Sequence, residues 1–324
     1  MLLKGFVEEE TGIDFDLFRE IERLKKEKNA VILAHYYQDS DIQDIADYVG
    51  DSLGLSRQAA ATKAEIILFA GVHFMAETAR ILSPNKKVLL PDLNAGCSLA
   101  DSCPPEKFKA FIAANPKAVV VSYVNCSAAV KAMTDIICTS ANAEGIINSL
   151  PRNQEIIFAP DKNLGKYLEK KTGRKLILWD GACMVHEIFS LMEIEKILLG
   201  NPDAELIAHP ECTEDILERA AFIGSTSELL AHTAKSATKT FVVATETGIL
   251  HQMIKKSPEK VFLSALPNYT CSCNYFPHMK LNTLEKVYLA LKNETPEITL
   301  EEEILNRALK PINRMLQISK ELGL

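Results

Sequence analysis

Three pairs of polar residues recur along this chain at nearly equal intervals, each beside an apolar run. The pairs are His35 and Tyr37, Tyr123 and Asn125, and His209 and Glu211. Their first members are 88 and 86 positions apart. Imidazole, phenol, amide and carboxylate groups move protons or orient small polar substrates. A single histidine at such a place is usually structural, but the repetition favours function. Glu211 is the only acid among the six, so it is the general-base candidate, with His209 and Tyr37 as its helpers.

A cysteine follows each pair at a similar distance. The separations are 62, 60 and 62 positions for Cys97, Cys183 and Cys271, with Cys273 as the alternative third member. Three thiols from three repeats can converge and hold an iron–sulfur cluster that leaves one iron without a protein ligand. Structural zinc sites usually contain tight Cys-x₂-Cys pairs, which this chain lacks. The plainer alternative is that the thiols are inert and buried.

A hydroxyl residue stands 17 positions after the first member of each pair. These residues are Ser52, Ser140 and Thr226, and Ser225 precedes the last one. Each stands before a stretch with helical character, so N-capping is the plain interpretation. The alternative is that three helix N-termini bind an anionic substrate through free N–H groups. His186 lies three positions after Cys183 and is expected in the same cavity, although a structural loop hydrogen bond is its plainer role.

The elements that must position these residues repeat as well. Short apolar runs without alternation predict strands at 30–34, 65–70, 87–90, 118–122, 155–159, 175–179, 205–208, 240–244 and 260–264. Such runs are typical of parallel sheets that are covered on both faces. In open parallel sheets, ligands bind at the carboxyl ends of the strands, where the polar pairs fall. The first helix of each repeat is predicted at 41–49, 128–137 and 214–222, with Gly50 and Gly224 as left-handed helix ends.

The predicted fold class is therefore α/β, with three pseudo-repeated αβα units, each a three-layer parallel sheet, around a pseudo-threefold axis. The expected ranges are 14–115 with an N-terminal helix, 116–200, and 201–324 with a C-terminal helix that Pro311 kinks or splits. Each repeat is under 90 residues and would be marginally stable alone, so the three should pack together.

Bulk composition narrows the function further. The net charge is −7 and basic residues form no run, so nucleic-acid binding is not expected. No apolar stretch reaches the roughly 18 residues of a membrane span, and the N-terminus lacks a signal peptide's apolar region. We therefore expect a cytoplasmic protein without a membrane partner. Eight cysteines in that compartment favour metal binding or reactive thiols over disulfides.

Several motifs together resemble the quinolinate synthase family. They are LAHYYQ at 33–38, GDS at 50–52, SYVN at 122–125, PDKNL at 160–164, HPEC at 209–212 and MKLNTL at 279–284. The resemblance runs from about Val31 to Leu291. It implies a [4Fe–4S] transferase of NAD biosynthesis with three αβα domains in a triangle. Such an enzyme condenses iminosuccinate (iminoaspartate) with dihydroxyacetone phosphate to give quinolinate, phosphate and water.

The resemblance also implies roles for individual residues. Cluster ligands would be Cys97, Cys183 and a cysteine of the 271–273 loop. Catalytic roles fall to His209, Glu211 and Tyr37. Substrate contacts fall to His35, Ser52, Tyr123, Asn125, Ser140 and Thr226. The expected protein partner is the enzyme that supplies iminosuccinate, either L-aspartate oxidase or aspartate dehydrogenase.

One departure from the family pattern concerns the third ligand. Many members place a cysteine where this chain has Phe276, so the ligand must be Cys271 or Cys273, and repeat spacing favours Cys271. The closest alternative function is a diphthamide-forming aminocarboxypropyl transferase, which also draws three cysteines from three repeats and cleaves S-adenosylmethionine. The histidine-containing pairs favour quinolinate synthase. A cluster-bearing sensor and a plain binding protein with structural cysteines are further alternatives.

Overall fold

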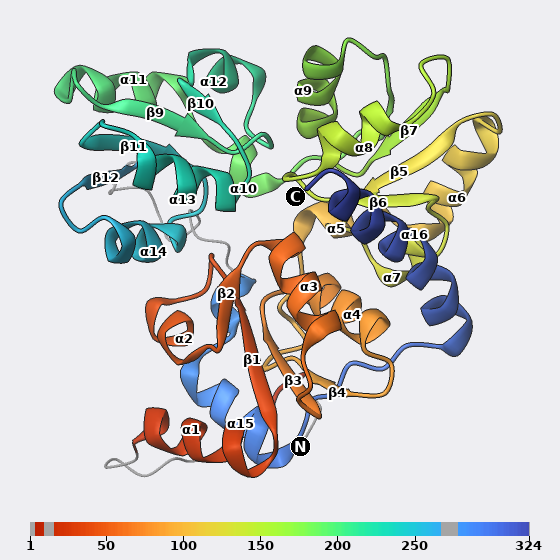
Figure 1. Cartoon of the computed structure of the whole chain (residues 1–324), viewed down its shortest axis with the longest axis vertical. Coiled ribbons are helices and arrows are strands. Elements are labelled where there is room, and N and C mark those ends of the chain that lie inside the picture. The colour runs from red at the N-terminus through yellow and green to blue at the C-terminus, as the bar shows by residue number, and fades with distance from the viewer. Residues whose placement is uncertain (1–3, 10–15, 267–277, 324) are drawn as a thin grey trace.

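The computed structural model of this chain describes residues 4–9, 16–266 and 278–323. Its core consists of three parallel sheets, each of four strands and each flanked by helices. Figure 1 shows the three resulting lobes around a common centre, with the N-terminal unit in red and orange. We call these lobes the first, second and third unit.

The three sheets share one topology. The first contains β1 (Ala30–His35), β2 (Tyr48–Gly50), β3 (Ile66–Ala70) and β4 (Lys87–Leu89), in the order β2-β1-β3-β4. The second has β5 (Val119–Tyr123), β6 (Ile136–Cys138), β7 (Ile156–Ala159) and β8 (Ile177–Leu178), in the order β6-β5-β7-β8. The third has β9 (Glu205–Ala208), β10 (Phe222–Ile223), β11 (Thr240–Ala244) and β12 (Val261–Ser264), in the order β10-β9-β11-β12. This confirms the predicted fold class of three pseudo-repeated α/β units.

Each unit has an edge strand that the sequence analysis assigned to a helix. The first helices end early, as α2 (Ser40–Ile45), α7 (Ala128–Lys131) and α12 (Glu214–Arg219). The residues that follow form β2, β6 and β10, which are only two or three residues long and too short to show a period. Gly50 and Gly224 are therefore not left-handed helix ends, and neither has a positive φ.

A second helix follows each edge strand, as the helical character after the hydroxyls indicated. These helices are α3 (Ser52–Ala61), α8 (Ala143–Ser149) and α13 (Thr226–Lys235). The other helices are α1 (Leu17–Glu27), α4 (His73–Leu82), α5 (Ser98–Asp101), α6 (Pro105–Ala114), α9 (Lys162–Thr172), α10 (Met184–Glu187), α11 (Leu191–Gly200), α14 (Ile249–Lys256), α15 (Leu284–Asn293), α16 (Glu302–Glu321) and the 3₁₀ helix η2 (Met279–Leu281).

Central strands carry the core. Leu33 of β1, Val121 of β5 and Ile207 of β9 occupy the middle of their strands and are inaccessible to solvent. Burying a side chain of this size contributes about 1.5–3 kcal/mol. One apolar cluster joins residues of all three units, so the units share a core in addition to their own. This agrees with the expectation that repeats of this size must pack together.

The last two helices of the chain reach back to the earlier units. Helix α15 packs against α1 and β3 of the first unit, and α16 packs against β6, α7 and α8 of the second. Figure 1 shows α16, in dark blue, lying across the second unit. Pro311 lies inside α16, which continues as one helix of 20 residues, so the proline does not split it. None of the helices within the described ranges combines the length and hydropathy that crossing a membrane requires.

Candidate active site

The three sheets direct their carboxyl ends at one cavity. His35 and Tyr123 are the last residues of β1 and β5, and His209 follows β9. This cavity, which we call the central cavity, has a volume of about 30 Å³. Eleven of the predicted site residues line it: His35, Tyr37, Ser52, Cys97, Tyr123, Asn125, Ser140, His186, His209, Glu211 and Thr226. Residues up to 191 positions apart in the sequence therefore meet at one place.

The two repeat-equivalent histidines are held in the same way. The backbone N–H of Tyr37 donates to Nδ1 of His35 at 3.2 Å, and that of Glu211 donates to Nδ1 of His209 at 3.4 Å. Because Nδ1 accepts a hydrogen bond in each histidine, the ring proton of both His35 and His209 is assigned to Nε2. Burial lowers the pKa of each histidine to about 3, so both rings are neutral at physiological pH. Nε2 of His209 lies 3.3 Å from the hydroxyl of Ser140.

Glu211 is a buried carboxylate with partners from the second unit. Its Oε1 accepts a hydrogen bond of 2.6 Å from the hydroxyl of Tyr123, and its Oε2 lies 3.0 Å from Nδ1 of His186. The ring nitrogen is not aligned as a hydrogen-bond donor, so this second contact is electrostatic. Burial pushes the pKa of Glu211 upward, but His186, His209 and, to a smaller extent, Tyr123 together outweigh it and lower that pKa to about 2. The carboxylate is thus ionised and able to accept a proton.

Thr245 was not predicted from the sequence but belongs to the site. Its Oγ1 lies 2.6 Å from the hydroxyl of Tyr37 and 3.1 Å from Nε2 of His186. Thr245 stands directly after β11, where Gly71 follows β3 and Pro160 follows β7. Comparison of the repeats could not single it out because the equivalent residues lack a hydroxyl. The rule that ligands meet the carboxyl ends of parallel strands could have done so.

Thr139 is a second residue that the sequence analysis did not select. It lines the cavity, its side chain is buried, and its Oγ1 has no hydrogen-bond partner among the described residues. Asn125, a predicted site residue, also lines the cavity, and its buried Oδ1 atom likewise has no hydrogen-bond partner among the described residues. Buried polar atoms are normally paired, so these two oxygens are suited to meet polar groups of a substrate.

The predicted hydroxyl residues divide into two kinds. Asp51 caps α3 and Ser225 caps α13, the latter in a reciprocal capping box with Glu228. Ser52 and Thr226, one position later, are left to line the cavity. N-capping is therefore correct for Ser225, which is completely buried and is not part of the cavity lining.

The cysteines occupy equivalent local positions. Cys97 precedes α5 and Cys183 precedes α10, both as N-cap residues and both buried. Burial raises the pKa of Cys97 to about 12, although backbone N–H groups of residues 99 and 100 oppose this rise. Burial also raises the pKa of Cys183, and the charge of Glu211 adds to that rise. A bound metal would supply the positive charge that two such thiolates require.

The donor set within the described residues suits a metal group. Ligand atoms of Cys183, His186 and Glu211 lie within 4.8 Å of one another. Soft thiolates that receive backbone N–H groups are typical ligands of iron–sulfur clusters. The two candidates for the third ligand, Cys271 and Cys273, lie outside the described residues.

Known proteins similar to this chain cover nearly all of it. A family model described as Quinolinate synthetase A protein matches residues 19–317. A protein named quinolinate synthase from Gloeothece citriformis is 63% identical over 308 residues, which is 95% of each chain. The proteins of that name from Trichodesmium erythraeum (62% over 308 residues, 95% of each chain) and Chloroherpeton thalassium (60% over 306 residues, 94% of this chain and 95% of the relative) agree. The chain belongs to the quinolinate synthase family.

Membership of the quinolinate synthase family confirms the resemblance seen in the motifs. It also confirms the prediction of an enzyme of NAD biosynthesis and favours it over the diphthamide-forming alternative. The match says nothing about individual residues, so the roles assigned to them stay predictions.

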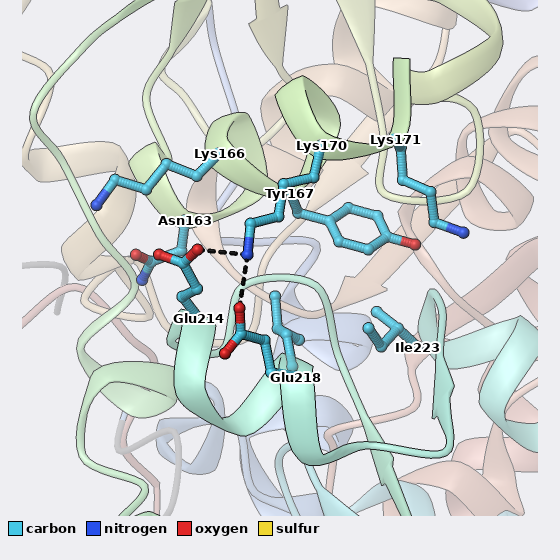
Figure 2. A pocket seen from close by; sticks show the side chains of 9 residues that line it. Asn163, Lys166, Tyr167, Lys170, Lys171, Glu214, Glu218 and Ile223 are labelled. Carbon is cyan, nitrogen blue, oxygen red and sulfur yellow. Dashed lines mark hydrogen bonds and ion pairs between the residues drawn. The ribbon is translucent and has the colours of Figure 1, made fainter. Parts of the chain in front are cut away.

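A larger cavity of about 180 Å³ lies between α9 of the second unit and α12 of the third. Figure 2 shows Lys170 reaching from α9 to Glu214 and Glu218 on α12, with the ring of Tyr167 beside them. Lys170 forms ion pairs with both carboxylates, and all three side chains are exposed to solvent. We call this place the seam cavity. None of the predicted site residues lines it.

Proposed function

We propose that this chain condenses iminosuccinate with dihydroxyacetone phosphate and releases quinolinate, phosphate and water. The observation that carries the proposal is the buried, ionised Glu211 in a cavity that all three units line. Forming a pyridine ring from these substrates requires repeated removal of protons from carbon and nitrogen. A carboxylate shielded from water and held by two polar partners can serve as that base.

Glu211 would accept protons at its carboxylate oxygens, and Tyr123 would hold Oε1 in place. His209 would donate from Nε2, because its Nδ1 already accepts the backbone N–H of Glu211. Tyr37 would act as an acid, since burial raises the pKa of its hydroxyl and keeps it protonated. Loss of water and phosphate requires such donors on the departing oxygen atoms.

Substrate carboxylates and phosphate would bind to neutral donors on the cavity wall. Nε2–H of His35 is available because its Nδ1 accepts a backbone N–H. The proposed contacts are His35, Ser52, Tyr123, Asn125, Ser140, His186 and Thr226, with Thr139 added to the set. Ser225 would act indirectly, by capping the helix that carries Thr226. The N-termini of α3 and α13 add favourable dipoles for anions.

A [4Fe–4S] cluster is the proposed cofactor. Cys97, Cys183 and either Cys271 or Cys273 would hold it. When bound, such a cluster supplies an iron that polarises a substrate oxygen as a Lewis acid. The support from this chain is the equivalent placement of two buried thiols at helix starts and the N–H groups directed at one of them.

We also propose the ranges 14–115, 116–200 and 201–324 as the three domains, a cytoplasmic location, and delivery of iminosuccinate by L-aspartate oxidase or aspartate dehydrogenase. The described cysteines are all free, which suits a reducing compartment. Limited proteolysis would test the ranges, because exposed linkers between domains are cut first.

The decisive experiment measures iron, sulfide and quinolinate formation after anaerobic purification. We expect about four irons per chain, as the proposed cluster type requires. Cys97→Ala and Cys183→Ala should lose the visible absorbance and the activity. Cys126→Ala, which also removes a buried thiol, is the matched control and should keep both. An iron-free wild-type protein, or cleavage of S-adenosylmethionine by reduced protein without quinolinate formation, would reject the proposal.

A further inference from the structure

The lining of the seam cavity is mainly apolar. Tyr167 on α9, Leu217 on α12 and Ile223 on β10 contribute apolar surface to it. The volume of about 180 Å³ is slightly above the roughly 150 Å³ of an apolar cavity that binds benzene. It is below the roughly 300 Å³ at which sites for drug-sized ligands begin. The seam cavity therefore has room for one six-membered ring with a small substituent.

Two donors at the seam cavity have no acceptor among the described residues. The ammonium of Lys171 lies 5.7 Å from the centre of the Tyr167 ring, and no carboxylate of the described ranges is within ion-pair distance of it. The hydroxyl of Tyr167 has no hydrogen-bond partner in those ranges either. Burial, with smaller contributions from Glu144 and Glu228, raises the pKa of Tyr167 to about 12, so the phenol keeps its proton. An ammonium and a phenol hydroxyl this close can donate to one carboxylate.

The acids that line the seam cavity stand apart from these two donors. Glu214 and Glu218 both pair with Lys170. Figure 2 shows this group on one side of the Tyr167 ring and Lys171 beyond the hydroxyl end of that ring. A ligand carboxylate at Lys171 would therefore meet a cation that no acid of the cavity already occupies, and it would not have to displace a glutamate from Lys170.

We propose that the seam cavity is a binding site for a small aromatic carboxylate. The ring of the ligand packs against Tyr167, Leu217 and Ile223, and its carboxylate accepts from Lys171 and from the hydroxyl of Tyr167. A flat ring suits the site because it can stack on the phenol, and a carboxylate suits it because both unpaired groups are donors. The inference goes beyond the proposed function and does not depend on it, since none of the predicted site residues lines this cavity.

Ligand-observed NMR on the full chain, purified anaerobically, measures the binding of benzoate, with benzamide as an uncharged probe of the same shape. For a ligand of this size we expect a Kd of about 0.1–10 mM for benzoate and a weaker one for benzamide. Lys171→Met should weaken benzoate about two- to fivefold, as the loss of an exposed ion pair does, and leave benzamide unchanged. Tyr167→Phe keeps the ring and should weaken benzoate by a similar factor. Lys175→Met, at an exposed lysine outside the cavity, is the matched control and should bind like wild type.

Leu217→Trp tests where the ring of the ligand binds, because the larger side chain fills the seam cavity. It should abolish benzoate binding and keep quinolinate formation within about twofold of wild type, which also shows that the variant is folded. Benzoate binding that survives Leu217→Trp would overturn the proposal. Equal affinity of wild-type protein for benzoate and benzamide, or binding of neither, would overturn it as well. None of these results bears on the proposed function, which the wild-type assay of quinolinate formation tests separately.

Discussion

The seam cavity and the central cavity both involve the second and third units, yet only one has the features of an active site. The seam cavity is larger, about 180 Å³ against about 30 Å³. It also brings cations and carboxylates together, through Lys170, Glu214 and Glu218. A well-formed pocket with a few converging polar groups is often the default hypothesis for a site. Here the difference lies in how deeply the charged groups are buried.

A contact between a carboxylate and a polar partner is worth more when both groups are buried than when water surrounds them. The side chain of Glu214 is 53% exposed. The hydrogen bond from Lys170 lowers its pKa, but water screens such a pair and makes it weak. Glu211 is 2% exposed, and removing a partner from a buried charge leaves it unpaired at high cost. Asn163 connects the two places, because it lines the seam cavity and donates at 3.2 Å to the carbonyl oxygen of Glu211.

The largest expected effect is that of Glu211→Gln. The substitution keeps the shape of the side chain and removes the base, so turnover should fall by about 10²–10⁴-fold. Iron content and visible absorbance should stay at wild-type values, since the cysteines are untouched. Glu214→Gln is the matched control at the seam cavity and should retain full activity. Wild-type turnover in Glu211→Gln would remove Glu211 from the mechanism.

Tyr123→Phe should have the next largest effect. It deletes the donor that lies 2.6 Å from Oε1 of Glu211 and leaves the carboxylate with the electrostatic contact to His186. A hydrogen bond to a charged group is worth about 1.5–3 kcal/mol, which corresponds to a 10- to 150-fold loss of kcat/KM. Steady-state kinetics measure this loss. Tyr167→Phe removes the hydroxyl of a phenol in the seam cavity and should change neither kcat nor KM.

Much of the fold could be predicted because the sequence repeats. The central strands β1, β5 and β9 are apolar, are covered on both faces, and precede the polar pairs, so their type and place follow from pattern alone. The edge strands β2, β6 and β10 could not be separated from the preceding helices. Two or three residues form a strand here only because a neighbouring strand offers its backbone, which is a tertiary effect.

The site was predictable where residues recur and was missed where they do not. His35 and His209 stand at equivalent positions and share the same backbone hydrogen bond to Nδ1. Thr245 has no equivalent hydroxyl, and its role depends on which side chains of other units reach it. Thr139 was overshadowed by its neighbour Ser140, which matched the 17-residue spacing.

Glu246→Gln tests a carboxylate that is buried like Glu211 but has no cation within hydrogen-bond distance among the described residues. Its Oε1 lies 3.7 Å from the ammonium of Lys280, beyond hydrogen-bond distance, and burial raises its pKa from 4.5 to about 7 despite that cation. The folded state therefore binds more protons than the unfolded chain between pH 4.5 and 7, and its stability falls as pH rises through that window. Glu246→Gln should remove this loss and gain up to about 3 kcal/mol at pH 8 relative to wild type.

Anaerobic urea unfolding at pH 5 and pH 8 measures this difference. The advantage of Glu246→Gln should be small at pH 5 and largest at pH 8. Glu218→Gln, at the exposed seam cavity, is the control and should show no such dependence on pH. A stability gain of equal size at both pH values would mean that Glu246 does not titrate in this window.

The smallest effect should come from Lys170→Met, which breaks both ion pairs of the seam cavity while keeping the length of the side chain. Lys170, Glu214 and Glu218 are all more than half exposed, so water already solvates them. We expect kcat within twofold of wild type and an unchanged melting temperature in 0.5 M salt, where screening removes surface pairs. At low salt, a slight destabilisation should appear, because Glu214 and Glu218 are four positions apart on one helix and repel without the lysine. If Lys170→Met instead lost activity at both salt concentrations, the seam cavity would have to communicate with Glu211 through Asn163, and burial would no longer separate the two cavities.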